Sequence, residues 1–188
     1  MNQIRSYFEQ FVQLSDDEWQ AFSSKLVQQQ VPKKTVLLDA NQTENYLSFV
    51  EQGIIRFFIP HEEKEVTFSF SFANEFFSAY DSFVTRTPAT YQVETLSETT
   101  LWRISYSDLQ VIYQTTTVGN LIGRLAAEGL FIKKTSRELS LLSQTAEQRY
   151  LGLFTQQRHL LQLIPLKYLA SYIGITPQAL SRIRARIC

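Results

Sequence analysis

Cysteine and histidine are scarce in this sequence, and their scarcity excludes several kinds of metal site. The 188 residues contain one cysteine, Cys188, and two histidines, His61 and His159. A single thiol cannot form an internal disulfide, nor can it supply a four-cysteine zinc site or an iron–sulfur cluster within one subunit. The histidines are also too few for a cupin-type enzyme, which gathers two or three histidines and a carboxylate around a metal. We therefore expect no metal or cofactor, and we expect the reducing cytoplasm as the compartment.

Long apolar segments and catalytic loop motifs are also missing. No apolar run approaches the roughly 18 to 20 residues that span a bilayer, and the N-terminus lacks the basic-then-apolar order of a secretory signal. Neither a glycine-rich phosphate loop nor a nucleophile elbow occurs. The sequence therefore predicts a protein that is not an enzyme and does not associate with membranes. A cupin-like jelly-roll enzyme is the least favoured interpretation.

The composition is that of a folded protein, but its charge is distributed unevenly. Hydrophobic residues make up 44% and charged residues 19% of a chain long enough for one core and a small satellite domain. The formal net charge is zero. However, residues 1–142 carry 12 basic and 17 acidic side chains, whereas residues 143–188 carry six basic and one acidic. This asymmetry indicates a sensor body joined to a module that faces phosphate groups, with chance clustering of surface charge as the alternative.

The first part of the chain predicts an α+β fold in which two helices precede a β jelly roll. Residues Gln3–Phe11 are amphipathic, and the capping-box pattern Ser15-Asp16-Asp17-Glu18 predicts a second helix that runs to Leu26. From Val31 onward, short runs rich in β-branched and aromatic residues alternate with turn signals. Many short strands at nearly even spacing are typical of a sandwich or jelly roll. The predicted strands are Thr35–Leu38, Tyr46–Glu51, Ile54–Pro60, Glu65–Phe72, Tyr91–Leu96 and Thr99–Ile104.

A long helix is predicted after a short one at Tyr106–Thr115. Apolar or small residues recur in it at alternating steps of four and three, which is the a/d pattern of a two-stranded coiled coil. We therefore predict a dimerisation helix, although a helix packed on its own sheet would show a similar pattern. The predicted domains are a sensor at residues 1–116, the dimerisation helix at 117–142 and an all-helical domain at 143–188. The seam consists of Val118, Ile122, Leu125, Gly129, Ile132, Ser136 and Leu139.

The segment Leu166–Ile187 has the pattern of a helix-turn-helix. Gly174 permits the positive φ needed at the end of the first helix, Thr176 can cap the second, and Pro177 fits its first turn. A simple two-helix corner with a solvated basic face is the alternative. The residues expected to face inward are Leu166, Leu169, Ala170 and Ile173 on the first helix and Ala179, Leu180 and Ile183 on the second.

The side chains left on the outer face of the second helix suit a DNA groove. Gln178 can pair with an adenine edge, Arg182 can fork onto guanine, and Ser181 can reach a phosphate. Arg186 is expected on the same face, and Lys167 at the start of the first helix is expected to contact the phosphate backbone. The sequence therefore predicts double-stranded DNA as a partner.

In this order of parts the chain resembles the Crp/Fnr family of bacterial transcription regulators. The resemblance covers nearly the whole chain, and its best anchors are the C-terminal motif and Phe49–Arg56, which is similar to the family's strand–glycine–strand turn. It implies a jelly roll of cyclic-nucleotide-binding type, a homodimer that reads a near-palindromic operator, and RNA polymerase as a further partner. It also implies that Gln178 and Arg182 read bases and that Thr176 contacts a phosphate. The main alternative is a ligand-binding or interaction module whose helix-turn-helix no longer functions.

The segment Asn74–Phe83 resembles the family's phosphate-binding cassette but lacks its charged residues. In cyclic AMP receptors the cassette supplies a glutamate for the ribose and an arginine for the phosphate, and here those positions hold Ala79 and Ala89. Losing two charge-assisted contacts, roughly 3–6 kcal/mol together, lowers affinity about a hundredfold to ten-thousandfold. We therefore expect a pocket that does not bind cyclic AMP, with a less anionic effector or none. The candidate pocket residues are Phe77, Ser78, Ala79, Tyr80, Ala89 and Thr90.

The family's other sensors and its wing are not found either. The iron–sulfur type needs several cysteines and the haem type needs axial ligands, whereas we expect His61 and His159 at the surface. The family often continues past the recognition helix into a small β-hairpin wing. This sequence stops at Cys188, so the wing is either absent or lies beyond that residue.

Overall fold

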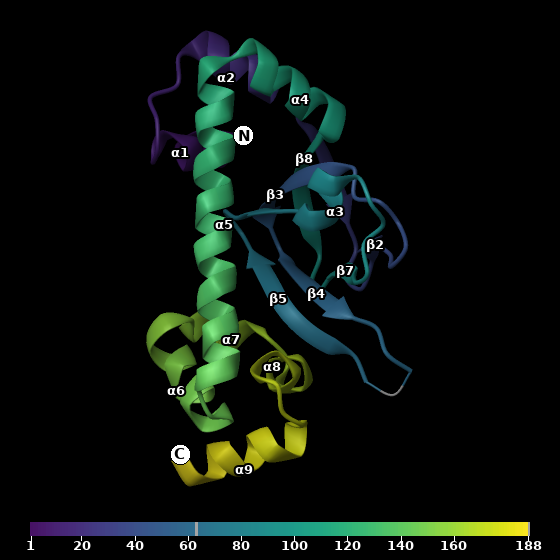
Figure 1. Ribbon diagram of the computed structural model, residues 1–188, viewed down its shortest axis with the longest axis vertical. Coiled ribbons are helices and arrows are strands. Elements are labelled where there is room, and N and C mark those ends of the chain that lie inside the picture. Colours follow the sequence, from purple (N-terminus) through teal and green to yellow (C-terminus); the bar gives the residue numbers. More distant parts are fainter. Residues whose placement is uncertain (63, 188) are drawn as a thin grey trace. The chain divides into compact units, whose positions relative to one another are not determined.

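A computed structural model describes residues 1–62 and 64–187, and the chain divides into two compact units (Figure 1). Unit 1 comprises Met1–Phe57 and Phe70–Glu128, and unit 2 comprises Phe58–Ser69 and Gly129–Cys188. Cys188, on which the expected reducing compartment rests, lies outside the described residues. Throughout the described ranges, no helix combines the length and the apolar character needed to cross a lipid bilayer.

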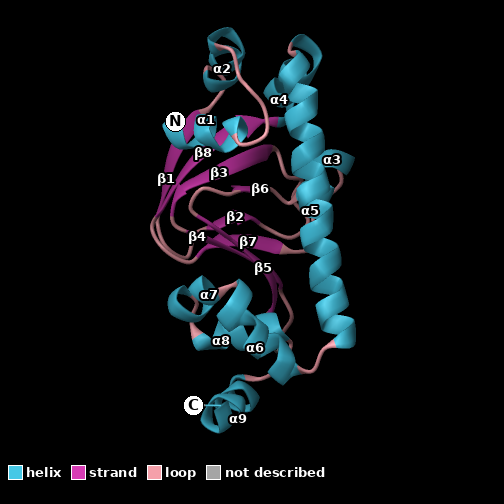
Figure 2. Ribbon diagram, turned by 90° about the vertical axis from the view of Figure 1, so that its left-hand side faces the viewer, coloured by secondary structure: helices cyan, strands magenta, loops and turns pink. Residues whose placement is uncertain are grey.

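Two four-stranded sheets form the predicted jelly roll (Figure 2). One sheet has the strand order β1-β8-β3-β6 and the other has the order β2-β7-β4-β5. Their inner faces meet through aromatic side chains, since buried Phe57 on β4 lies 6.1 Å, centroid to centroid, from buried Phe77 on β6. The predicted mixed fold is confirmed, and each predicted strand has a counterpart. The strands are β1 (Val27–Val31), β2 (Val36–Leu38), β3 (Tyr46–Gln52), β4 (Ile54–Ile59), β5 (Val66–Phe72), β6 (Phe76–Phe77), β7 (Gln92–Thr95) and β8 (Thr99–Ser105).

Strands β1 and β6 and the short helix α3 (Tyr80–Thr85) were not predicted from the sequence. β1 reads Val-Gln-Gln-Gln-Val and buries its last residue alone, so it lacks the alternation that marks a strand. It is nevertheless paired along its whole length with β8, from Val27 opposite Arg103 to Val31 opposite Thr99. The helix predicted to reach Leu26 ends earlier, since α2 (Asp16–Ser23) is followed directly by β1.

The turn between β3 and β4 requires its glycine. Gly53 has a φ of +118°, and a Cβ placed there would lie 2.3 Å from Thr99 Oγ1. Both the left-handed backbone and the close approach of β8 exclude a larger residue. This is the strand–glycine–strand turn that carried part of the family resemblance.

The N-terminal helices share a core with the outer end of the jelly roll. α1 (Asn2–Glu9), α2 and α4 (Tyr106–Thr115) cover β3 and β8 with one apolar cluster. The predicted capping box at the start of α2 is present, because Ser15 Oγ accepts the Glu18 N–H while the Glu18 carboxylate accepts the Ser15 N–H. The cluster consists of Ile4, Phe8, Phe22, Leu26, Phe49, Phe83, Ile104, Leu109 and Ile112. Burying each such side chain contributes roughly 1.5–3 kcal/mol.

The second half of the chain is helical. α5 (Thr117–Ser143) is 27 residues long and belongs to unit 1 as far as Glu128 and to unit 2 from Gly129. It is followed in unit 2 by α6 (Ala146–Gln156), α7 (Arg158–Leu163), α8 (Leu166–Ile173) and α9 (Pro177–Ile187). Unit 2 also contains the tip of the β4–β5 hairpin, Phe58–Ser69. The buried side chains of its helices are Tyr150, Leu153, Leu160, Leu169, Ala170, Ile173, Leu180 and Ile183, together with Ile164 of the α7–α8 connection.

Candidate nucleic-acid interface and sensor site

α8 and α9 are joined by a tight turn that depends on Gly174. This residue has a φ of +85°, in the left-handed region that favours glycine. The backbone N–H of Ile175 donates to the carbonyl oxygen of Ala170 (3.0 Å), and the N–H of Gly174 donates to that of Ser171 (3.0 Å). These bonds satisfy carbonyl groups that the end of a helix would otherwise leave unpaired. The predicted glycine turn is confirmed.

The start of α9 is also formed as the sequence predicts. Thr176 Oγ1 accepts the backbone N–H of Ala179 (3.2 Å), and Pro177 is the first residue of the helix. The inner face packs on the rest of the domain, with Leu180 0% and Ile183 6% exposed and Ala179 half-buried. A capped helix with a buried inner face fixes the backbone from which its outer side chains project.

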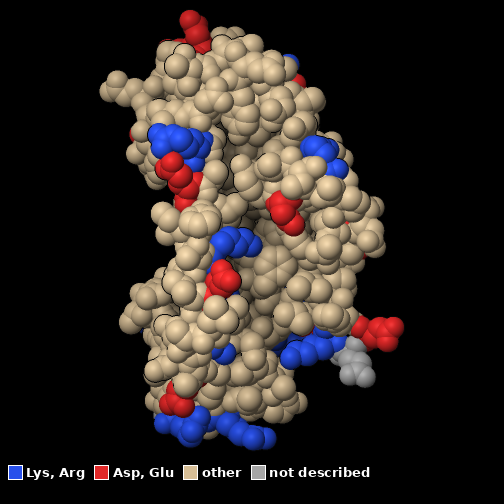
Figure 3. Space-filling model, in the orientation of Figure 1, with Lys and Arg blue, Asp and Glu red and all other residues tan. Residues whose placement is uncertain are grey.

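All the side chains predicted to contact DNA are exposed. Figure 3 shows basic side chains gathered over α9. Besides Thr176, which caps the helix, two of these side chains contact the protein: Ser181 Oγ donates to the Pro177 carbonyl oxygen (3.0 Å), and Arg186 forms an exposed ion pair with Glu147 (3.0 Å). A surface ion pair of this kind contributes at most about 1 kcal/mol, so a phosphate can replace Glu147. The exposed set is Lys167, Thr176, Gln178, Ser181, Arg182 and Arg186.

Two arginines that the sequence analysis did not single out hold the end of α8. Arg149 Nε donates to the carbonyl oxygen of Ile173 (2.9 Å). Arg137 of α5 donates to the carbonyl oxygen of Tyr172, and its guanidinium lies 3.9 Å from the centre of the Tyr172 ring. Burial lowers the pKa of Arg137, an effect that Tyr172 opposes. Cations at a helix C-terminus offset its negative dipole end, so both arginines stabilise the position of α8.

The predicted dimer seam on α5 divides into a covered part and an exposed part. Val118, Ile122 and Leu125 are half-buried, and Ile122 packs against the apolar cluster of unit 1. In contrast, Ile132 is 67% and Leu139 58% exposed. Gly129 and Ser136 are exposed as well.

Most exposed apolar side chains of α5 lie on a face rotated from the predicted seam, whereas Leu141, which is 44% exposed, lies on a different face. Leu121, Ile132 and Leu139 are separated by 11 and 7 residues, both close to whole turns of a 3.6-residue helix, and Leu142 follows three residues after Leu139. Leu142 is 77% exposed, and Phe131 beside the same face is 72% exposed. We call Leu121, Phe131, Ile132, Leu139 and Leu142 the apolar stripe of α5. The stripe shares Ile132 and Leu139 with the predicted seam, and it contains Leu121 in place of the neighbouring Ile122.

In the cassette, the two positions that lost their charged residues are covered by protein. Ala79, the N-cap of α3, is 0% exposed, and Ala89 is 1% exposed. Phe77 is buried, Ser78 and Tyr80 are half-buried, and Thr90 is exposed. The candidate pocket residues thus lie close together in sequence but differ in whether a ligand can reach them.

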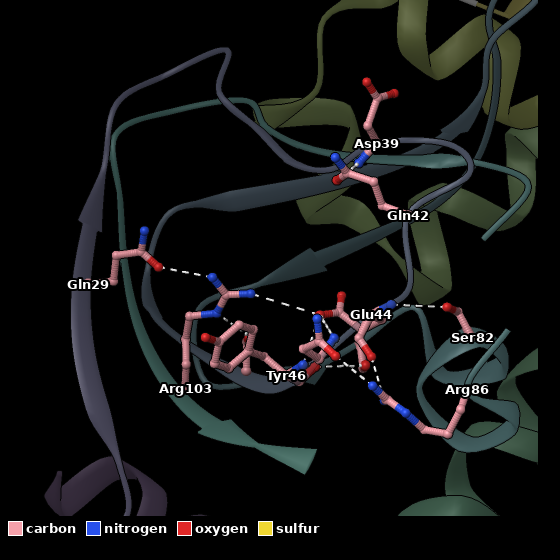
Figure 4. A network of polar contacts seen from close by, with 11 residues as sticks. Gln29, Asp39, Gln42, Glu44, Tyr46, Ser82, Arg86 and Arg103 are labelled. Carbon is pink, nitrogen blue, oxygen red and sulfur yellow. Dashed lines mark hydrogen bonds and ion pairs between the residues drawn. The ribbon is translucent and has the colours of Figure 1, made fainter. Parts of the chain in front are cut away.

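The loop that precedes β3 binds the cassette backbone. The carboxylate of buried Glu44 accepts hydrogen bonds from the backbone N–H groups of Asn45 (3.0 Å) and Tyr46 (2.9 Å), within the network shown in Figure 4. Burial raises the pKa of Glu44, and the backbone N–H of Ala79, which lies beside the same carboxylate, opposes this effect. The Ala89 N–H donates to the Gln42 carbonyl oxygen (2.9 Å). The loop therefore supplies an acceptor at one alanine position and a carboxylate beside the other.

The far end of α3 is fastened to the same loop. Arg86 Nη1 donates to the main-chain carbonyl oxygen of Glu44 (2.6 Å), and Ser82 Oγ accepts the Glu44 N–H (3.0 Å). Arg103 lies 3.9 Å from the Glu44 carboxylate and 4.0 Å from the centre of the Tyr46 ring. Burial raises the pKa of Glu44, and burial lowers the pKa of Arg103, so desolvation outweighs the attraction between them.

Aromatic side chains fill the space between the sheets beside the cassette. Besides its contact with Phe77, the Phe57 ring lies 6.5 Å from that of Tyr91, centroid to centroid. The Tyr91 hydroxyl donates to the Asp81 carboxylate on α3, and burial together with this bond raises the pKa of Tyr91. The cassette is thus tied to the inner sheet surface by apolar and polar contacts.

The two histidines do not contribute to either site. His61 is exposed beside the hairpin turn, and His159 is exposed on α7. Among the described residues, no group of three or more His, Cys, Asp or Glu side chains could hold a metal ion.

Comparisons with known proteins agree with this geometry. Residues 28–116 match the family described as cyclic nucleotide-binding domain. No curated protein sequence matches the chain.

Three solved structures show the extent of the structural likeness. A protein from Eubacterium rectale assigned to the Crp/Fnr family of transcriptional regulators has a TM-score of 0.74 at 18% identity, over 97% of this chain and 87% of its own. FixK2 from Bradyrhizobium japonicum has a TM-score of 0.73 at 14% identity, over 86% and 84%. A mutant of CooA from Carboxydothermus hydrogenoformans has a TM-score of 0.70 at 16% identity, over 87% and 77%. The predicted resemblance is therefore confirmed: the chain carries a region similar to cyclic nucleotide-binding domains and has the fold of the Crp/Fnr transcription regulators.

Proposed function

We propose that this protein is a DNA-binding transcription regulator of the Crp/Fnr type that acts in the cytoplasm. The observation that carries the proposal is the outer face of α9, where Gln178, Ser181 and Arg182 are exposed on a helix whose inner face is buried. Glutamine and arginine are the side chains that read adenine and guanine edges in the major groove. The net positive charge of residues 143–188 supports the proposal, since phosphate contacts supply most of the affinity for DNA.

The regulator acts as a homodimer through the apolar stripe of α5. Ile132, Leu139 and Leu142 are each more than half exposed, and a second copy of the same stripe would remove them from water. A twofold dimer presents two copies of α9, which meet successive major grooves about 34 Å apart. The operator is therefore a near-palindrome. RNA polymerase is a further partner if the protein activates transcription, whereas repression needs only the operator.

The cassette does not bind cyclic AMP. Ala79 and Ala89 offer no charged group to a ribose or a phosphate, and both are covered by protein. The Ala89 N–H donates to the Gln42 carbonyl oxygen, and the Glu44 carboxylate interacts with the Ala79 backbone, so an anionic ligand would meet an acceptor and a negative charge already in place. An effector, if the protein uses one, is less anionic than a cyclic nucleotide.

Selection from random double-stranded DNA tests the function. The full-length protein should enrich two inverted half-sites one helical turn apart, and its affinity for them should fall steeply as salt rises. If the helix-turn-helix is non-functional and the protein is an interaction module, no sequence will be enriched. Enrichment of a single half-site would contradict the dimer instead.

A further inference from the structure

A serine of α8 is hydrogen-bonded to the backbone of the β4–β5 hairpin tip within unit 2. Ser171 Oγ donates to the carbonyl oxygen of Glu65 (3.0 Å) and accepts the backbone N–H of Thr67 (2.9 Å). Thr67 is 1% exposed, so its N–H depends on a partner in the protein. A single hydroxyl therefore fixes two backbone groups of the strand.

The arrangement imitates the pairing of a neighbouring strand. In an extended chain, the carbonyl of one residue and the N–H of the residue two positions later point to the same edge. β5 is the outermost strand in the order β2-β7-β4-β5. Because a hydroxyl donates and accepts at once, Ser171 can take one ladder position beside β5.

The same C-terminal end of α8 is held by two further contacts within unit 2. Arg137 and Arg149 donate to the carbonyl oxygens of Tyr172 and Ile173. A second contact joins α5 to the hairpin tip, since Lys134 Nζ lies 5.0 Å from the centre of the Phe68 ring. The position of α8, and of α9 across the short turn that follows it, is thus set partly by the hairpin tip.

The hairpin tip is continuous along the chain with strand residues next to the cassette. Phe57 directly precedes the tip, and its ring contacts those of Phe77 and Tyr91 in unit 1. A paired strand is a stiff element, so a displacement of Phe57 moves the residues that follow it.

We propose that Ser171 is a positioning residue that latches the first helix of the helix-turn-helix to the hairpin tip and, through β4, to the cassette. The latch lies on α8 and leaves Gln178 and Arg182 exposed, so the latched arrangement is compatible with DNA binding. The effect on DNA affinity rests on the proposed function, whereas the latch itself can be measured without DNA.

Hydrogen exchange of the full-length protein tests the latch. In Ser171→Ala, exchange of the Thr67 amide should accelerate roughly 5- to 10-fold, because its acceptor is gone. Exchange of the Ala179 amide at the start of α9 should accelerate as well. Ser171→Thr keeps the hydroxyl and should restore both rates, and Ser143→Ala, whose hydroxyl bonds only within α5, is the matched control. Unchanged exchange at Thr67 or at Ala179 in Ser171→Ala overturns the proposal.

Two further measurements test the coupling. Phe57→Leu, a mild change beside the cassette, should also accelerate exchange at Thr67, and an unchanged rate would remove the link to the cassette. Ser171→Ala should bind the selected operator about 3- to 10-fold more weakly, with Ser171→Thr close to wild type. An unaltered affinity in Ser171→Ala would overturn the latch as a determinant of DNA binding. A wild-type protein that binds no DNA would contradict the proposed function and leave the exchange results standing as the test of the latch.

Discussion

The polar groups on the outer face of α9 and those of the cassette around α3 have opposite surroundings. On α9, Gln178 and Arg182 are exposed on a rigid helix. In the cassette, the side chains at Ala79 and Ala89 are apolar and buried, the Ala89 N–H donates to the chain's own loop, and the Glu44 carboxylate of that loop interacts with the Ala79 backbone. Polar groups that are already satisfied gain little from a ligand, whereas exposed and fixed donors gain from one. The difference teaches that the region proposed to read DNA is open to an external partner and that the cassette is closed by the chain itself.

The largest expected effect comes from separating the two copies of α9. Ile132→Glu places a charge on the apolar stripe of α5, and its burial against a second copy would be strongly unfavourable. The variant should sediment as a monomer, and its affinity for the operator should fall by about a hundredfold or more, because each half-site then binds alone. Leu163→Glu changes an exposed leucine of α7, away from the stripe, and should remain a dimer. A wild-type protein that is monomeric at micromolar concentration would contradict the dimer.

The next largest effect distinguishes a residue that reads bases from one that contacts phosphate groups, and both residues belong to the exposed helix-turn-helix. Arg182→Ala should cost about 1–3 kcal/mol per half-site and relax the base preference at one symmetric position. Lys167→Ala should weaken binding to all sequences alike and flatten the salt dependence. Repeating the selection with each variant distinguishes the two. If Arg182→Ala keeps the wild-type preference at every position, Arg182 does not read a base.

A pair of glycine substitutions tests whether the rigidity of the reading region depends on its turn. Gly174→Ala forces a side chain into the left-handed region and should lower the free energy of unfolding by about 1–2 kcal/mol. Gly152→Ala, inside α6 and with open space around its Cα, should raise it by roughly 0.5–1 kcal/mol. Urea denaturation measures both. If both substitutions raise the free energy of unfolding, the backbone at Gly174 is not constrained.

The smallest effect concerns the closed region and depends on pH. Burial raises the folded-state pKa of Glu44 above its value in the unfolded chain, so between the two values the folded protein binds more protons. This stability contribution is present below pH 4.5, the ordinary pKa, and is lost as pH rises through the folded pKa. The stability of the wild type relative to Glu44→Gln should therefore decline as pH rises from 4.5. If the stability of the wild type relative to Glu44→Gln rises with pH instead, the hydrogen bonds to the Glu44 carboxylate stabilise its charged form by more than burial destabilises it.

The sequence predicted the helix-turn-helix better than the cassette, because local rules decide the former. Gly174, Thr176 and Pro177 act through backbone angles and capping, which depend on a few neighbouring residues. The loss of charge at Ala79 and Ala89 was also visible. The role of Glu44 was not, since its contacts with the backbone of Ala79 and with Ser82 join segments far apart in the sequence.

The remaining differences have similar causes. β1 was not predicted because its three consecutive glutamines show no alternation of apolar and polar residues, and its pairing is set by β8. The apolar stripe of α5 is rotated from the predicted seam because Ile122 is used by the core of unit 1, which periodicity alone does not reveal. No sequence pattern marked Ser171 or Arg137, since each forms hydrogen bonds with main-chain groups of a segment far away in the sequence.

The contrast between an open reading region and a closed cassette is tested most directly by DNA binding with and without cyclic AMP. Fluorescence anisotropy with the selected operator would measure the Kd of the full-length protein in the absence of any nucleotide. The same measurement would be repeated with cyclic AMP at about 100 µM, which would fill most of any site with a Kd of about 10 µM or below. The account predicts specific binding without nucleotide and the same Kd in its presence. Specific binding that appears only when cyclic AMP is added would contradict it.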